Sequence, residues 1–230
     1  MTPLVLLPGM MCDARLFGPQ IAALGQRRAL HLAALTEHAT TADLARAVLA
    51  AAPPRFALAG LSMGGIIAIE IVHQAPERVE RLALLDTNPR AELPEVQARR
   101  APQMEKARTG HLRAVMRDEM KPNYLVESPD KQRILDLCME MAMGLGPEVF
   151  VRQSLALRDR PDRQETLRGV TVPTLVLCGQ EDQLCPVERH RLMHDLVPGS
   201  RLEILPGAAH LPTLEQPLAT NAALARWLEE

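Results

Sequence analysis

The sequence has few aromatic residues, which limits how a binding site can be built. Of 230 residues, one is tryptophan, one is tyrosine and three are phenylalanine, 2% in all. Aromatic stacking on planar ligands is therefore not expected to dominate recognition. Since leucine, alanine, valine, isoleucine and methionine must fill the core, we expect a substrate pocket lined mostly by aliphatic and thioether groups.

Long apolar runs, a strong net charge and paired cysteine motifs are also missing. No apolar stretch approaches the roughly 20 residues of a membrane-spanning helix, and the formal net charge of −2 favours neither a nucleic acid nor a membrane as partner. The four cysteines have no metal-ligand spacing, and the N-terminus lacks the basic region and long apolar run of a signal peptide. We therefore expect a cytoplasmic protein without metal or cofactor.

The remaining composition is that of one globular domain. Hydrophobic residues make up 47% and charged residues 23% of a chain long enough for one α/β domain with an insertion. Apolar runs of strand length alternate with helical patterns, which predicts a doubly wound, mostly parallel sheet of about six strands. The predicted strands lie near 4–7, 28–34, 56–61, 81–86, 174–179 and 201–205.

Strand signals disappear between residues 90 and 166. This stretch is helical in pattern and divided by prolines. We predict that 90–166 form a helical cap inserted into a core made of 1–89 and 167–230. Its first half is rich in arginine, including Arg99 and Arg100, which we interpret as a solvated helix face.

A glycine-flanked serine follows the third predicted strand. Gly60-Leu61-Ser62-Met63-Gly64 stands between an apolar run and an apolar helix, the strand–turn–helix setting of a nucleophile elbow. In so tight a turn Gly60 and Gly64 avoid the clash that a Cβ would cause. The pattern predicts that the Ser62 hydroxyl is exposed above the sheet.

Two more reactive side chains follow strands at the same edge of the predicted sheet. Asp182 comes after the strand near 174–179, and His210 after the strand near 201–205. A serine hydroxyl needs a base such as imidazole, and the imidazole needs an acceptor on its other nitrogen. The chain order Ser62, Asp182, His210 is the one expected for a catalytic triad in this kind of fold.

Other residues offer alternatives at this edge. Asp86 also ends a strand and competes with Asp182 for the role of triad carboxylate, although the position of Asp182 before the histidine strand favours Asp182. His190 and His194 have the spacing of helical metal ligands, but no third ligand accompanies them, so we interpret them as residues of a surface helix. Cys12 and Cys185 are expected to border the site as wall residues.

With these residues the chain resembles the α/β-hydrolase fold superfamily over nearly its whole length. The resemblance rests on residues 6–10, 60–64, 179–186 and 207–210. It implies Ser62 as nucleophile, His210 as base and Asp182 as the orienting carboxylate. It also implies an oxyanion hole made by the backbone N–H groups of Met10 and Met63, and a helical cap. Many relatives carry His-Gly where this chain has Pro-Gly, and its sheet is expected to lack the first two strands of larger members.

The predicted function is that of a cofactor-independent serine hydrolase cleaving a small ester, thioester or lactone through an acyl-enzyme on Ser62. One alternative keeps the triad and changes the reaction to carbon–carbon bond hydrolysis, acyl transfer or lyase chemistry. Another is a ligand-binding or regulatory protein with little turnover. The expected partner is a small ester-type molecule, and both a monomer and a homodimer remain open.

Overall fold

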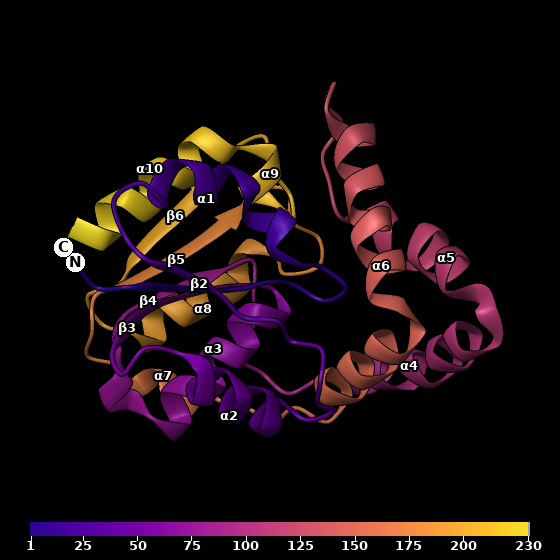
Figure 1. The fold of residues 1–230 in the computed structure, drawn as a ribbon, viewed down its shortest axis with the longest axis horizontal. Coiled ribbons are helices and arrows are strands. Elements are labelled where there is room, and N and C mark those ends of the chain that lie inside the picture. The colour runs from indigo at the N-terminus through magenta and orange to yellow at the C-terminus, as the bar shows by residue number, and fades with distance from the viewer. Residues whose placement is uncertain (230) are drawn as a thin grey trace.

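A single parallel sheet organises the computed structural model, which describes residues 1–229 apart from the side chain of Asn123 (Figure 1). Within these residues six strands pair in the order β2–β1–β3–β4–β5–β6. Their bounds are β1 Leu4–Leu7, β2 Leu30–Leu32, β3 Phe56–Leu61, β4 Val79–Leu85, β5 Thr174–Gly179 and β6 Arg201–Leu205. The predicted doubly wound sheet of about six strands is confirmed.

Helices cover both faces of this sheet. Helix α1, the short helix α9 and helix α10 lie on one face, while α2, α3, α7 and α8 lie on the other (Figure 1). The bounds are α1 Gly18–Leu24, α2 Thr41–Ala51, α3 Met63–Gln74, α7 Gln164–Arg168, α8 Val187–Leu196, α9 Pro212–Glu215 and α10 Pro217–Glu229. The short helices η1 Ala14–Phe17 and η2 Pro76–Arg78 complete the connections. Because both faces are covered, the central strands can be apolar at every position.

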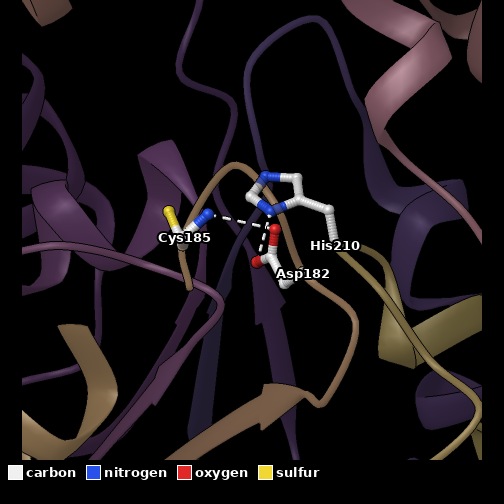
Figure 2. Close-up of side chains that lie close together, drawn as sticks. All are labelled: Asp182, Cys185 and His210. Carbon is white, nitrogen blue, oxygen red and sulfur yellow. Dashed lines mark hydrogen bonds and ion pairs between the residues drawn. The ribbon is translucent and has the colours of Figure 1, made fainter. Parts of the chain in front are cut away.

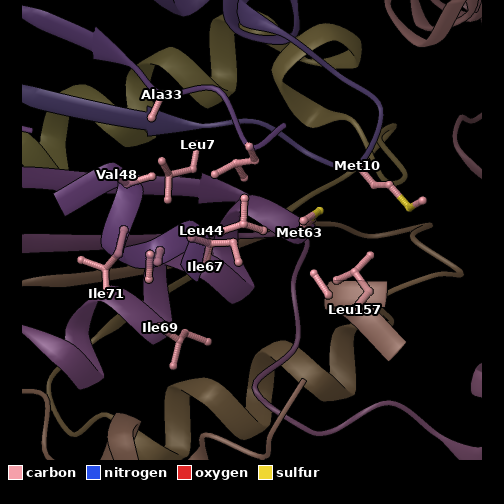
Figure 3. Close-up of a cluster of buried hydrophobic side chains, with 14 of the residues drawn as sticks. Leu7, Met10, Ala33, Leu44, Val48, Met63, Ile67, Ile69, Ile71 and Leu157 are labelled. Carbon is pink, nitrogen blue, oxygen red and sulfur yellow. The ribbon is translucent and has the colours of Figure 1, made fainter. Parts of the chain in front are cut away.

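Alternate residues of each strand supply two separate cores. In β1, Leu4 and Leu6 join a buried cluster that also holds Trp227 of α10. Val5 and Leu7 of the same strand join a second cluster with α2 and α3 (Figure 3). This division follows from the two-residue repeat of side chains along a strand.

A helical insertion between β4 and β5 forms a separate lobe at the carboxyl ends of the strands (Figure 1). It contains α4 Pro94–Lys106, η3 Ala107–His111, α5 Leu112–Ala114, η4 Val115–Met120, η5 Lys121–Asn123 and α6 Lys131–Arg158. Helix α6 is interrupted at Gly146, which has a non-helical φ of 82° and is followed by Pro147. Helix α6 continues beyond this kink to Arg158.

The insertion shares a core with the sheet. Leu157 of α6 belongs to the same buried cluster as Met10 of the loop after β1, and Figure 3 places both at one end of it. Helix α7 straddles the predicted cap boundary at residue 166 and packs against α3 and α8. Among residues 1–229, the structure contains no helix with both the length and the apolar character that a membrane crossing requires.

Candidate functional site

Ser62 occupies a strained turn between β3 and α3. Its φ and ψ of 55° and −115° lie outside the regions that most residues adopt. A Cβ on Gly60 would lie 2.2 Å from the carbonyl oxygen of Gly64, and a Cβ on Gly64 would lie 2.0 Å from that of Leu7. Only glycine fits at these two positions, as the motif predicted from sterics.

The structure brings Ser62, His210 and Asp182 together. His210 Nε2 lies 2.9 Å from Ser62 Oγ, and His210 Nδ1 lies 2.8 Å from Asp182 Oδ2, an interaction drawn in Figure 2. Both His210 and Asp182 are buried. The backbone N–H of His210 donates to the carbonyl of Tyr124 in the insertion at 2.9 Å. The histidine therefore sits between the two side chains with one ring nitrogen facing each.

Asp182 is held as a carboxylate. Its Oδ1 accepts hydrogen bonds from the backbone N–H groups of Leu184 and Cys185 at 2.8 and 3.0 Å. Burial alone raises the pKa of this carboxyl, but the attraction and hydrogen bond of His210, together with the backbone donors, outweigh burial and lower the pKa to about 2. Asp182 is thus ionised at any pH at which a histidine can act as a base.

Asp86, the alternative acid, lies behind Asp182. It is fully buried with a φ of 43°, and its Oδ1 accepts from the backbone N–H of Gly179 at 3.0 Å. Burial, and next the nearby charge of Asp182, raise the pKa of Asp86 well above its ordinary value. Burial therefore favours the protonated form of Asp86, and among the described residues its Oδ2 has no hydrogen-bond partner. Within the described chain its side chain makes no hydrogen bond with His210.

Two residues that line the cavity with Ser62 have a backbone N–H without a hydrogen-bond partner in the described part of the chain. Among residues 1–229, no acceptor is hydrogen-bonded to the N–H of Met10 or of Met63. Both residues line the same cavity as Ser62. Since an unpaired N–H beside a nucleophilic hydroxyl is suited to binding a developing negative oxygen, both groups have the chemistry that an oxyanion hole needs.

Sequence reasoning missed the residue that holds the loop after β1. Met11, which follows Met10 in this loop and has a φ of 56°, donates its backbone N–H to Gln153 Oε1 at 2.8 Å. Gln153 Nε2 in turn donates to the carbonyl of Leu35 at 2.8 Å. Gln153 comes from the C-terminal part of α6, where no local pattern marks a glutamine as a structural contact.

The interpretation of His190 as a surface residue is wrong. His190 is fully buried, its Nε2 accepts from the backbone N–H of Thr87 at 3.1 Å, and its Nδ1 lies 3.2 Å from the carbonyl of Pro186. Burial lowers its pKa to about 4, so it is neutral. His194 instead bonds Ser200 Oγ at 2.8 Å, and the two histidines do not share a ligand site.

Three potential metal ligands do lie close together. Within residues 1–229, one group of this kind is found: ligand atoms of Asp182, Cys185 and His210 within 4.8 Å of one another (Figure 2). Burial raises the pKa of the Cys185 thiol, and the negative charge of Asp182 raises it further. A cysteine binds a metal as a thiolate, and a raised pKa disfavours that form. The three residues are therefore better suited to the pairing of Asp182 with His210 than to holding a metal.

The cavity in front of Ser62 is more polar than the composition predicted. It encloses about 300 Å³ between the sheet edge and the insertion. Cys12 and Cys185 line it, as expected, beside Met10 and Met120. It is also lined by six charged residues, Glu92, Arg99, Arg100, Glu119, Arg160 and Arg189. Arg100 is buried and thus not part of the solvated helix face that we predicted.

Comparison with known proteins agrees with this architecture. The sequence model described as "Alpha/beta hydrolase family" matches residues 4–223. The chain is 27% identical over 234 residues to the pimeloyl-[acyl-carrier protein] methyl ester esterase of Nitrosomonas europaea, covering 93% of this chain and 90% of that protein. It is 28% identical to the protein of the same name from Pectobacterium atrosepticum, covering 94% and 90%.

A solved structure agrees as well. A thermophilic esterase from Thermogutta terrifontis, solved with malate bound, matches with a TM-score of 0.90 and 26% identity. The match covers 100% of this chain and 90% of that chain. The superfamily resemblance found in the sequence is therefore confirmed.

Proposed function

The chain belongs to the alpha/beta hydrolase family, and from that premise we propose that it hydrolyses a carboxylic ester through an acyl-enzyme on Ser62. The observation that carries the proposal is the continuous set of contacts from Ser62 Oγ through His210 to Asp182, at 2.9 and 2.8 Å. The names of the two bacterial relatives, both methyl ester esterases, support the choice of an ester.

The geometry supports the following sequence of steps. Ser62 Oγ attacks the ester carbonyl carbon while His210 Nε2 takes its proton. The N–H groups of Met10 and Met63 stabilise the oxyanion, each by about 3 kcal/mol in comparable sites. His210 then protonates the departing alcohol oxygen, which leaves the acyl group on Ser62. A water molecule gives its proton to His210 and attacks the acyl carbon, releasing the acid and restoring Ser62.

Asp182 has a supporting role in each step. As a carboxylate bonded to His210 Nδ1, it sets the tautomer that leaves Nε2 free to accept a proton. It also stabilises the imidazolium that forms twice per turnover. The low pKa of Asp182, about 2, keeps the negative charge in place throughout.

We propose that residues 90–166 act as a cap that selects the substrate. Several of the residues that line the cavity, among them Glu92, Arg100 and Met120, come from this insertion. A volume of about 300 Å³ is at the small end for ligand pockets, so we expect a small acyl or alcohol group. The finer choice among ester, thioester and lactone also depends on this surface.

Labelling of Ser62 is the direct test. Wild type and Ser62→Ala are treated with a fluorophosphonate and examined by intact mass, and turnover of p-nitrophenyl esters of increasing acyl length is measured in parallel. We expect one adduct on wild type, none on Ser62→Ala, and turnover reduced by about 10⁴- to 10⁶-fold. The exposed Ser128 provides the control, since Ser128→Ala should label and turn over as wild type does.

Two results would overturn the proposal. One is a folded wild type that forms no adduct, and the other is ester turnover that Ser62→Ala leaves unchanged. Saturable binding of small esters without turnover would instead favour a ligand-binding protein on a hydrolase fold.

A further inference from the structure

A buried cluster of charges stands at the wall of the cavity. Glu92 pairs with Arg100 through the guanidinium Nε at 3.0 Å and through Nη2, and with Arg160 Nη2 at 2.9 Å. The three side chains are 7%, 11% and 6% exposed. Two guanidinium groups thus share a single carboxylate in a site largely closed to water.

This cluster has an excess of positive charge. Two cations and one anion leave a net charge of +1, and burying an uncompensated charge is costly. Within the described residues, the acceptor that Arg100 Nη1 reaches is Met10 Sδ, at 4.0 Å, and a thioether is a weak acceptor. Burial lowers the pKa of Arg160, with Glu92 opposing this effect and Arg100 adding to it. A second anion would therefore stabilise both arginines.

The excess positive charge lies in the wall of the cavity that also holds Ser62 and His210. Arg100 contacts Met10 Sδ, and Met10 and both arginines line the cavity that holds Ser62. The surrounding charges add to the imbalance. Arg99 lines the same cavity and has no ion-pair partner in the described part of the chain, whereas the acidic Glu119 already pairs with Lys106 at 2.8 Å.

We propose that the substrate ester carries a second, anionic carboxylate group, which Arg100 and Arg160 bind while Ser62 attacks the ester carbonyl. Planar guanidinium groups match a carboxylate with paired N–H donors. The small cavity requires a short spacer between the two groups, so the substrate class is the half-ester of a short dicarboxylic acid. This inference rests on the proposed function and specifies its substrate.

The test compares esters that differ only in this charge. Methyl half-esters of succinic, glutaric and adipic acid are paired with counterparts in which the free carboxylate is a carboxamide, and methanol release is measured at fixed ionic strength. For at least one chain length we expect wild type to prefer the carboxylate by about 10- to 100-fold in kcat/KM, the range of a charge-assisted contact. Arg100→Met and Arg160→Met should reduce that ratio at least several-fold.

A matched variant controls for a general loss of positive charge. Arg117 lies in the same insertion, is 66% exposed and pairs with Asp118, and Arg117→Met should leave both rates unchanged. Arg100→Lys keeps the charge without the planar fork and should recover part of the preference. Thermal unfolding establishes that each variant is folded.

Binding can also be measured without turnover. Isothermal titration of glutarate into Ser62→Ala should give saturable binding that Arg100→Met in the same background weakens by about tenfold or more, whereas the neutral diamide of glutaric acid should not bind. This arm separates the two proposals, since it requires no reaction at Ser62.

Three results would overturn the inference. One is a wild type that hydrolyses the carboxamide esters as well as the half-esters at every length. Another is a preference that survives in both folded arginine variants, since the cluster would then serve stability alone. The third is a failure of glutarate to bind Ser62→Ala. This result does not depend on whether the arginine variants fold. Normal Ser62 labelling beside any of these would leave the proposed function intact.

Discussion

Gln153 Oε1 accepts the backbone N–H of Met11 at 2.8 Å, and this bond ties the insertion to the loop that carries Met10. Nε2 of the same glutamine donates to the carbonyl of Leu35 at 2.8 Å, so both the oxygen and the nitrogen of its side-chain amide are hydrogen-bonded. Met11 has a positive φ, a conformation that costs energy in a non-glycine residue. We infer that Gln153 maintains the strained loop and, through it, the direction of the Met10 N–H.

Replacing Gln153 should therefore affect both stability and turnover. Gln153→Leu leaves the Met11 N–H buried without an acceptor, at a cost of about 1–3 kcal/mol, and we expect kcat for p-nitrophenyl esters to fall more than KM changes. Urea unfolding and steady-state kinetics measure the two effects. Gln132→Leu on the exposed part of α6, whose side chain bonds only Asp136, is the control. Unchanged kcat in folded Gln153→Leu would contradict the role of the loop.

The two neighbouring aspartates should differ sharply when each is changed to asparagine. Asp182→Asn removes the charge that faces His210, and kcat should fall by about 10⁴-fold. Asp86→Asn keeps an oxygen for the Gly179 N–H and leaves the contact between Asp182 and His210 in place, so a much smaller loss is expected. Steady-state kinetics at neutral pH decide between them. An equal loss in both variants would argue that Asp86 shares the role of the triad acid.

The same pair predicts opposite effects of pH on stability. The pKa of Asp182 falls from 3.8 to about 2 on folding, so this carboxylate stabilises the fold above about pH 4, and the contribution is lost as the pH drops toward 2. The pKa of Asp86 is raised instead, so its contribution declines as the pH rises above 3.8.

Denaturation of both variants across pH tests this. Asp182→Asn should lose more stability relative to wild type at pH 7 than near pH 2. Asp86→Asn should gain stability relative to wild type at pH 8 compared with pH 3, because asparagine cannot ionise in the unfolded chain. Parallel curves for wild type and Asp86→Asn over this range would refute the assignment of a neutral Asp86.

Arg78 should matter for stability and not for catalysis. Its guanidinium donates to four backbone carbonyls at and beyond the end of α2, those of Leu49, Ala52, Pro53 and Pro54, at 2.7–3.0 Å. Such donors satisfy carbonyls that a helix end leaves unpaired. Arg78→Met should lower the free energy of unfolding by about 1–3 kcal/mol. Esterase activity should be retained, since Arg78 lies at the amino end of β4, opposite the cavity. Arg55→Met, which removes an exposed arginine paired only with Glu80, provides the comparison.

Features that depend on residues close together in the sequence were predictable. The turn around Ser62 was predictable, because its motif lies within five residues and the clash at Gly60 comes from Gly64 and Gly65 of the same segment. The clash at Gly64 comes from Leu7 and Pro8 at the end of the adjacent strand, which the fold places there. The order of strands and helices was predictable for the same reason, since apolar periodicity is a local property. The chain order of Ser62, Asp182 and His210 then indicated which side chains meet.

Burial and long-range polar pairing were not predictable. His190 shows no local sign of being buried, and the pattern of arginines in the insertion gave Arg100 the same weight as its exposed neighbours. Only the packing of the insertion, in which α4 lies against α6, places Arg100 and Arg160, from opposite ends of that insertion, on one carboxylate of Glu92. The same packing brings Gln153 to Met11, 142 residues away.

The sequence by itself thus determined the sheet and the serine turn, because periodicity and the motif act over a few residues. It also indicated Asp182 and His210 as the partners of Ser62, because each follows a strand and parallel strands end at the same edge of the sheet. The tertiary structure alone decided the charge of the cavity, the raised pKa of Asp86 and the support of the Met10 loop. Each of these depends on which distant groups share a site closed to water, where an unpaired charge or N–H is costly.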